Sequence, residues 1–202
     1  MNEKKIYNLF PVPIFHYKVE NYKEINEELI NYILKLKKKD KIGNNRSNIG
    51  GWHSPNFDLV KEETPIHFIN KFKDFLKNII INEFGWEYLP NKQRIVAMWA
   101  IINKKNSFNI MHNHQNCYLS ASYYVKKPER SGDISFFDPV EPKTYRYPEK
   151  EKGTFHSNQV VTLKPEEGDL LVFPSYLYHS VQPNLSDEDR VVISFNVDIE
   201  YN

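Results

Sequence analysis

The sequence predicts a mainly β (α+β) protein: an antiparallel double-stranded β-helix, or jelly roll, supported by N-terminal helices. Three observations favour this class. Aromatic residues make up 14% of the 202 residues, which is typical of strand-rich proteins. Short β-rich runs separated by turn signals fill the C-terminal half, and two stretches with helical spacing precede them. We expect a single domain, 1–202, with a helical support region over 1–92 and the jelly-roll core over 93–202.

The N-terminal half predicts one short strand and two amphipathic helices. Residues 14–19 have the length and composition of a strand. Over 21–39 apolar residues recur at helical spacing, and the lysines at its end suit a helix C-terminus. A polar, glycine-rich loop follows at 43–51. A second helix is predicted over 64–84.

From residue 93 onward the pattern changes to strands. Regular short strands with Gly and Pro turns indicate a sandwich or barrel. The connection 138–158 is longer than packing alone requires, so we expect it to be a lid or a substrate-binding loop. The predicted strands are 94–103, 109–114, 119–126, 133–137, 159–163, 169–173 and 190–199.

Composition narrows the function classes. The 27 basic and 26 acidic residues nearly cancel, so no global field would attract nucleic acid or anionic lipid. The longest apolar run, 95–102, is far shorter than the roughly 20 residues of a membrane helix, and the N-terminus has no secretory signal pattern. We expect a cytoplasmic protein without a membrane partner and with nucleic acid not its main target. The Lys, Asn and Ile bias suits the AT-rich genome of a phage or marine bacterium.

One cysteine against seven histidines excludes a disulfide framework and a Cys-rich zinc site. A metal would therefore be held by imidazole and oxygen. His112 and His114 are two residues apart in a predicted strand, so their side chains leave the same face. His179 follows 65 residues after His114, and Arg190 follows 11 residues after His179. An imidazole pair, a distant imidazole and an arginine form an ordered pattern.

This pattern suits a non-haem Fe(II) oxygenase. Iron needs protein ligands on one side and open positions on the other for oxygen and a 2-oxo acid. A buried arginine, Arg190, can receive the far carboxylate of 2-oxoglutarate in a fork geometry that lysine cannot match. Alternation places Ser194 on the same face as Arg190, and Tyr124 and Ser122 are candidates for the same pocket.

At these residues the sequence resembles the uncharacterised bacterial and phage branch of the 2-oxoglutarate and Fe(II)-dependent oxygenases. The resemblance implies a jelly-roll oxygenase that couples the oxidative decarboxylation of 2-oxoglutarate to hydroxylation, with release of succinate and CO2. The wider superfamily implies His-x-Asp/Glu and a distal His for iron, and an Arg for the co-substrate. From the order of the residues in this sequence we expect Fe(II) on His112, His114 and His179. We expect 2-oxoglutarate on Arg190, Ser194 and Tyr124, O2 as co-substrate, and no catalytic residue beyond the metal ligands. The segments that carry it are 9–14, 50–54, Trp99, 112–114, 119–125, 132–139, 168–175, His179 and 190–196.

Three features depart from the usual pattern, one of them Gln115 in the place where Pro usually follows the second histidine. The usual carboxylate ligand of the wider superfamily is replaced by His114, which leaves either a three-histidine site or a site with two protein ligands and water. Asp138 is the nearest rival carboxylate to complete the metal site. The position two after the arginine, often Ser in this branch, is Val192, which leaves the donor role to Ser194.

Two other function classes stay open. One is a cupin-type metal-binding jelly roll, acting as an isomerase or a three-histidine dioxygenase without 2-oxoglutarate. The other is a non-catalytic binding protein of the same fold. The prime substrate is not specified, with a peptide, an amino acid or a nucleotide all compatible, and an edge strand would allow a homodimer.

Overall fold

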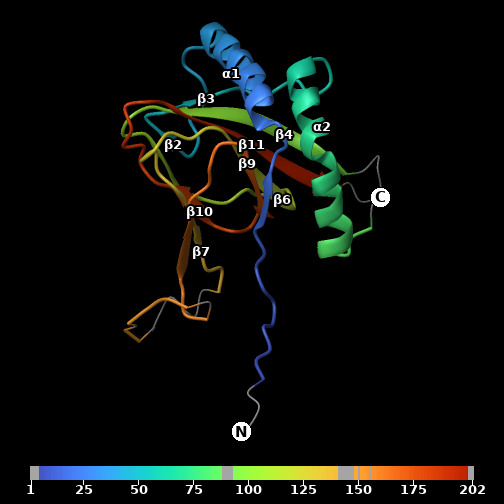
Figure 1. Cartoon of the computed structure of the whole chain (residues 1–202), viewed down its shortest axis with the longest axis vertical. Coiled ribbons are helices and arrows are strands. Elements are labelled where there is room, and N and C mark those ends of the chain that lie inside the picture. The colour runs from blue at the N-terminus through green and yellow to red at the C-terminus, as the bar shows by residue number, and fades with distance from the viewer. Residues whose placement is uncertain (1–4, 88–92, 141–147, 150, 155, 200–202) are drawn as a thin grey trace.

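The computed structural model of the chain describes residues 5–87, 93–140, 148–149, 151–154 and 156–199. Two antiparallel β-sheets face each other, and two helices cover the outer side of the larger sheet (Figure 1). Within this described part no helix is long and apolar enough to cross a membrane.

The six-stranded sheet has the order β1-β9-β6-β11-β4-β3, and the five-stranded sheet has the order β2-β5-β10-β7-β8. Among the described strands from β4 to β11, only β7 and β8 are consecutive in the chain and paired with each other. The other pairs in this range join strands that are not consecutive, as in a jelly roll. The strands of the larger sheet are β1 Phe15–Lys18, β3 Trp52–His53, β4 Gln93–Asn103, β6 Leu119–Lys126, β9 Asp169–Pro174 and β11 Arg190–Ile199. Those of the smaller sheet are β2 Asn48–Ile49, β5 Phe108–His112, β7 Ile134–Phe137, β8 Val160–Leu163 and β10 His179–Val181.

The two helices are α1, Tyr22–Lys39, and α2, Glu63–Asn78. Each buries one apolar stripe, as its spacing requires. The predicted second helix extends to residue 84, but its last turn, η1 (Ile79–Glu83), is π-helical, with the Phe84 N–H donating to the Ile79 carbonyl at 3.0 Å. The helical residues fully buried against the larger sheet are Ile25, Leu29, Ile33, Phe68 and Phe72.

Strand β11 contributes side chains both to the apolar core and to a cavity. Its odd-numbered residues, among them Ile193 and Phe195, are buried in the core that the larger sheet forms with the helices. Phe195 stacks on Phe72 with ring centroids 5.0 Å apart. The alternate residues, from Arg190 to Asn196, line a cavity between the two sheets, because successive side chains of a strand leave opposite faces.

The seven predicted C-terminal strands are all present, and no end is shifted by more than two residues. Three strands were not predicted: β2, β3 and β10, which have only two or three residues each and therefore show no alternation. The predicted strand 109–114 ends at His112, so His114 lies just beyond β5. β1, β2 and β3 all fall within residues 1–92.

Candidate metal centre and anion pocket

A cavity of about 710 Å³ lies between the two sheets. Its inner wall is formed by the cavity-facing residues of β4, β6 and β11, and the smaller sheet closes it from the other side. Every site residue predicted from the sequence lines this one cavity: His112, His114, His179, Arg190, Ser194, Tyr124 and Ser122.

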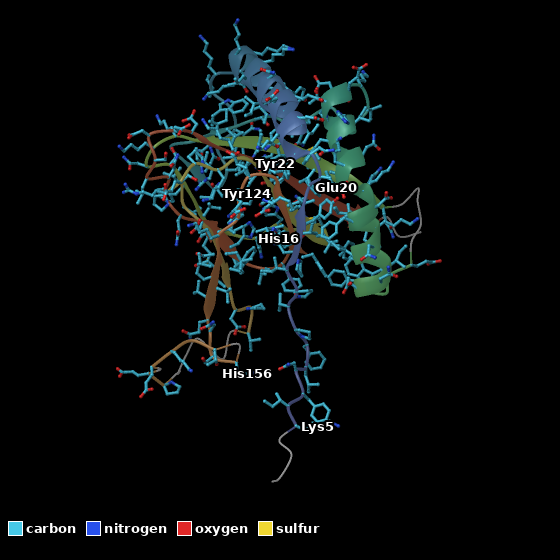
Figure 2. The ribbon with its side chains drawn as sticks, viewed as in Figure 1. Lys5, His16, Glu20, Tyr22, Tyr124 and His156 are labelled. Carbon is cyan, nitrogen blue, oxygen red and sulfur yellow. The ribbon has the colours of Figure 1, made fainter. Side chains whose placement is uncertain are left out.

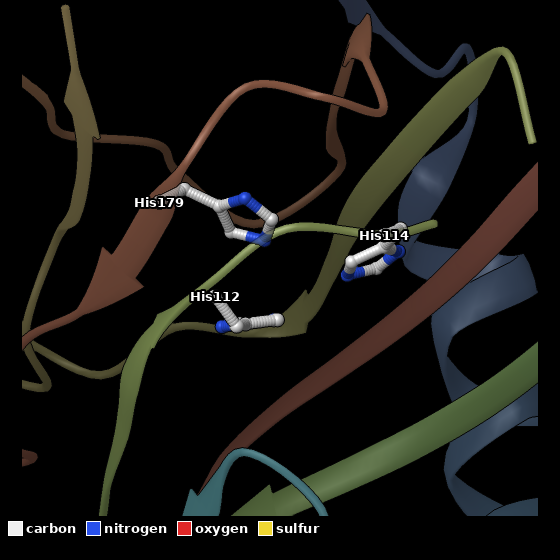
Figure 3. Close-up of side chains that lie close together, drawn as sticks. All are labelled: His112, His114 and His179. Carbon is white, nitrogen blue, oxygen red and sulfur yellow. The ribbon is translucent and has the colours of Figure 1, made fainter. Parts of the chain in front are cut away.

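The three histidines are brought together by strand pairing. β10 pairs with β5 so that His179 lies directly opposite His112. His114 follows β5 and is fixed by its own backbone, whose N–H donates to the Ser175 carbonyl at 2.9 Å. One potential ligand nitrogen from each ring lies within 4.8 Å of the others, and Figure 3 shows the three rings converging.

The hydrogen bonds of the rings define their tautomers. Nδ1 of each ring lies beside an oxygen that can only accept, so Nδ1 carries the proton. Nε2 is left with a lone pair, which is the form that binds a metal. The Nδ1 partners are the Ile110 carbonyl for His112 (2.7 Å), the Leu177 carbonyl for His179 (3.0 Å) and the Asn196 side-chain oxygen for His114 (2.6 Å).

Burial keeps the three rings neutral. It lowers the pKa of His112 and of His114 below the ordinary value. For His179 burial, with the nearby His112 and His114 adding to it, lowers the pKa to about 3. At neutral pH all three imidazoles are therefore uncharged, with a proton on Nδ1 and a lone pair on Nε2 that can bind a metal.

Asp138, the rival carboxylate, is not brought to this cluster. It follows the end of β7, and its Oδ1 accepts the Val140 N–H at 2.8 Å, as in a turn. Among the described residues, the group of potential metal ligands consists of the three histidines alone. Part of the predicted lid, residues 141–147, 150 and 155 of 138–158, lies outside the described residues.

Arg190 begins β11 and is 1% exposed. Its Nη1 donates to the carbonyls of Ser131, Gly132 and Gln182. Its Nη2 is buried without a hydrogen-bond partner in the described protein. Burial lowers the pKa of Arg190 to about 10, so the guanidinium remains charged at neutral pH. An unpartnered charged donor at the wall of a cavity is a binding group for an anion.

Glycine is required beside this arginine. Gly132 has φ +84°, and a Cβ there would lie 2.8 Å from Arg190 Nη1 and 2.3 Å from the Gln182 carbonyl oxygen. The backbone can therefore approach the guanidinium only without a side chain.

The hydroxyl residues lie next to Arg190 across the β11–β6 pair. Ser194 lies opposite Ser122, and Val192 lies opposite Tyr124. Tyr124 is in the interior of the molecule (Figure 2), and burial raises its pKa. The phenol is therefore neutral and can donate a hydrogen bond to an anion held by Arg190.

Three contributors to the cavity were missed from the sequence. Asn196 orients His114, and its place on the Arg190 face was visible from strand alternation. The other two are Ser47 and His53, which lie in loop-like sequence without periodicity. The Ser47 Oγ lies 3.3 Å from His112 Nε2, and His53 had no role assigned from the sequence. Their approach to the cavity depends on tertiary contacts.

The fold and the cavity define a class: a jelly-roll protein with a candidate three-imidazole metal centre beside a buried arginine. Residues 97–196, from β4 to β11, match the family model described as "Putative 2OG-Fe(II) oxygenase". This segment contains every predicted site residue, and the family that it matches uses Fe(II) and 2-oxoglutarate. No curated protein matches the sequence.

Solved structures agree on the fold. A prolyl-4-hydroxylase of Pseudomonas putida is 12% identical, with a TM-score of 0.67 and 94% of each chain covered. HygX of Streptomyces hygroscopicus, with nickel and 2-oxoglutarate bound, is 10% identical, with a TM-score of 0.65 over 94% of this chain and 84% of that one. The viral collagen prolyl hydroxylase of Paramecium bursaria Chlorella virus-1, in complex with 2-oxoglutarate, is 14% identical, with a TM-score of 0.58 over 91% and 94%. These likenesses place the chain in the double-stranded β-helix fold.

Proposed function

We propose that this protein is an Fe(II)- and 2-oxoglutarate-dependent oxygenase that hydroxylates a substrate and releases succinate and CO2. The observation that carries the proposal is the position of Arg190. Arg190 lines the same cavity as three converging imidazoles, and its buried Nη2 has no hydrogen-bond partner among the described residues. A metal site next to a fixed anion site is what a chelating 2-oxo acid with a second carboxylate requires.

The residues fit both groups. His112, His114 and His179 would hold Fe(II) through Nε2, with Nδ1 already committed to protein acceptors. Arg190 would bind the far carboxylate of 2-oxoglutarate, with Ser194 and Tyr124 as further donors. Bound Fe(II) supplies the oxygen and redox chemistry, while the protein positions the reactants and limits water in the cavity.

The test separates binding from turnover. With Mn(II) in place of iron, calorimetry should show 2-oxoglutarate binding, and Arg190→Met should weaken it by about 30-fold or more because a buried charge–charge contact is lost. Arg94→Gln, which removes an exposed arginine on β4 that does not line the cavity, is the matched control. With Fe(II) and O2 the wild type should release succinate. Absence of oxygen-dependent succinate, or unchanged binding in Arg190→Met, contradicts the proposal.

A second candidate function is favoured by one observation: among the described residues, the group of potential metal ligands consists of imidazoles alone. A three-histidine dioxygenase that does not use 2-oxoglutarate would have the same cluster. It would bind Fe(II) and react with O2, but Arg190→Met would leave its metal and oxygen reactions unchanged and 2-oxoglutarate would not bind.

A further inference from the structure

The cavity has a second wall, and two of its residues, Arg46 and His53, have no part in the proposed metal and 2-oxoglutarate sites. Residues 44–56 connect the two sheets: β2 pairs with β5 of the smaller sheet and β3 pairs with β4 of the larger one. Backbone bonds fix this segment, from the Asn44 N–H to the His53 carbonyl (2.8 Å) and from the Ile110 N–H to the Ser47 carbonyl (3.0 Å). The wall is thus held in place before any ligand binds.

The charged side chains that line the cavity, among the described residues, are all positive. Its lining contains two arginines, Arg46 and Arg190, and among the described residues no Asp or Glu. Arg46 is exposed, and within the described part of the chain its guanidinium has no ion-pair partner. With Arg190 committed to 2-oxoglutarate, Arg46 is the charged group left for a second anion.

His53 adds a hydrogen-bond acceptor to the same wall of the cavity as Arg46. Its Nδ1 donates to the Ser54 carbonyl at 2.7 Å, so Nε2 carries the lone pair. The ring lies parallel to Trp99, with centroids 5.6 Å apart and planes 11° apart, and Trp99 in turn contacts His114. Burial, and then the charge of Arg46, lower the pKa of His53, which keeps this acceptor unprotonated.

We propose that Arg46 and His53 form the subsite for the prime substrate, and that this substrate is a small molecule carrying a carboxylate or phosphate together with an N–H or O–H donor. Arg46 binds the anion, and His53 Nε2 accepts from the donor. The inference rests on the proposed function, because it assigns the other half of the cavity to the metal and 2-oxoglutarate. A cavity of about 710 Å³ is in the range of small-ligand pockets, and it must hold 2-oxoglutarate as well. Amino acids, hydroxy acids and phosphate monoesters have the required chemistry.

The experiment is a thermal-shift and calorimetric screen of the protein loaded with Mn(II) and 2-oxoglutarate. The probes are matched pairs: amino acids and hydroxy acids with their carboxamides, and nucleoside monophosphates and sugar phosphates with the unphosphorylated compounds. We expect at least one charged member to raise the melting temperature and its neutral partner not to. The acid pairs and the phosphate pairs distinguish the two sources of the anion.

Variants of Arg46 and His53 then test whether these residues contact the bound probe. For the probe that binds, Arg46→Gln should weaken binding about tenfold or more, and His53→Phe, which keeps the ring stack on Trp99, should weaken it while the anion contact remains. Arg94→Gln should bind as the wild type, and all three variants should bind 2-oxoglutarate normally. If no charged probe binds, or if binding does not depend on Arg46, the proposal is overturned. Loss of 2-oxoglutarate binding in the wild type would instead contradict the proposed function.

Discussion

The two faces of the larger sheet are built by the same strands for different purposes. The outer face of β4, β6 and β11 is apolar and packs against α1 and α2, with Met98, Tyr123 and Phe195 fully buried. The inner face of the same strands carries polar groups, such as Ser122 and Ser194, toward the cavity. Each strand therefore contributes alternately to the core and to the site.

Successive residues of one strand therefore have different roles: one is buried in the core and stabilises the fold, and the next faces the cavity and can contact a ligand. Apolar burial on the outer face supplies the free energy of folding. The inner face keeps buried polar groups without protein partners, such as Arg190 Nη2, which costs stability unless a ligand satisfies them. Truncating a core-facing residue should therefore lower the free energy of unfolding, whereas truncating the adjacent cavity-facing residue should mainly weaken ligand or metal binding.

The largest expected effect is on the inner side of the cavity. His179→Ala removes one of three imidazole ligands, so metal retention after anaerobic Fe(II) loading should fall below detection, because two ligands do not complete the site. Iron analysis after desalting measures this. The apparent melting temperature without metal should stay near that of the wild type, and retained iron would show that the ligand set is wrong.

Phe195→Ala tests the outer face. Its ring is fully buried and stacks on Phe72, so truncation should lower the free energy of unfolding by about 3–5 kcal/mol. Urea denaturation measures the change. The adjacent Ser194→Ala should alter it by less than about 1 kcal/mol while weakening 2-oxoglutarate binding. Equal destabilisation by both variants would remove the distinction between the faces.

Asn196→Ala tests whether the hydrogen bond that orients His114 contributes to metal affinity. The Asn196 side-chain oxygen accepts from His114 Nδ1 at 2.6 Å, and losing such a partner typically lowers metal affinity about 10–100-fold. Competition with a chelator measures the affinity. Ser120→Ala, which removes the other donor to the same oxygen, at 3.0 Å, should have a smaller effect.

The smallest expected effect is on the pH dependence of the stability of the metal-free protein. Burial lowers the pKa of His179 to about 3, whereas in the unfolded chain it is about 6.5. Between these values only the unfolded chain takes up the proton, so the metal-free protein loses stability as the pH falls below about 6.5, by about 1 kcal/mol for this group between pH 7 and 5.5. His179→Gln should lose that much less over the same interval in urea denaturation. An identical loss in both proteins would contradict the burial of a neutral ring.

Much of the fold could be predicted from the sequence because it depends on local periodicity. Alternation in 190–199 and 119–126 and the helical spacing over 21–39 are properties of consecutive residues. The residue types and the order of His112, His114, His179 and Arg190 indicated a metal and anion site, and the structure brings these residues to one cavity. The short strands β2, β3 and β10 had no such signal.

The sequence by itself determined the fold class, the two faces of each long strand and the residue types available to the site. The tertiary structure decided which groups meet. It placed Asn196 on His114, left Asp138 in a turn, and folded 44–56 across both sheets so that Arg46 and His53 reach the cavity. The physical reason is that periodicity specifies the direction of a side chain within its own element, whereas a cavity is formed by pairings between elements far apart in the chain.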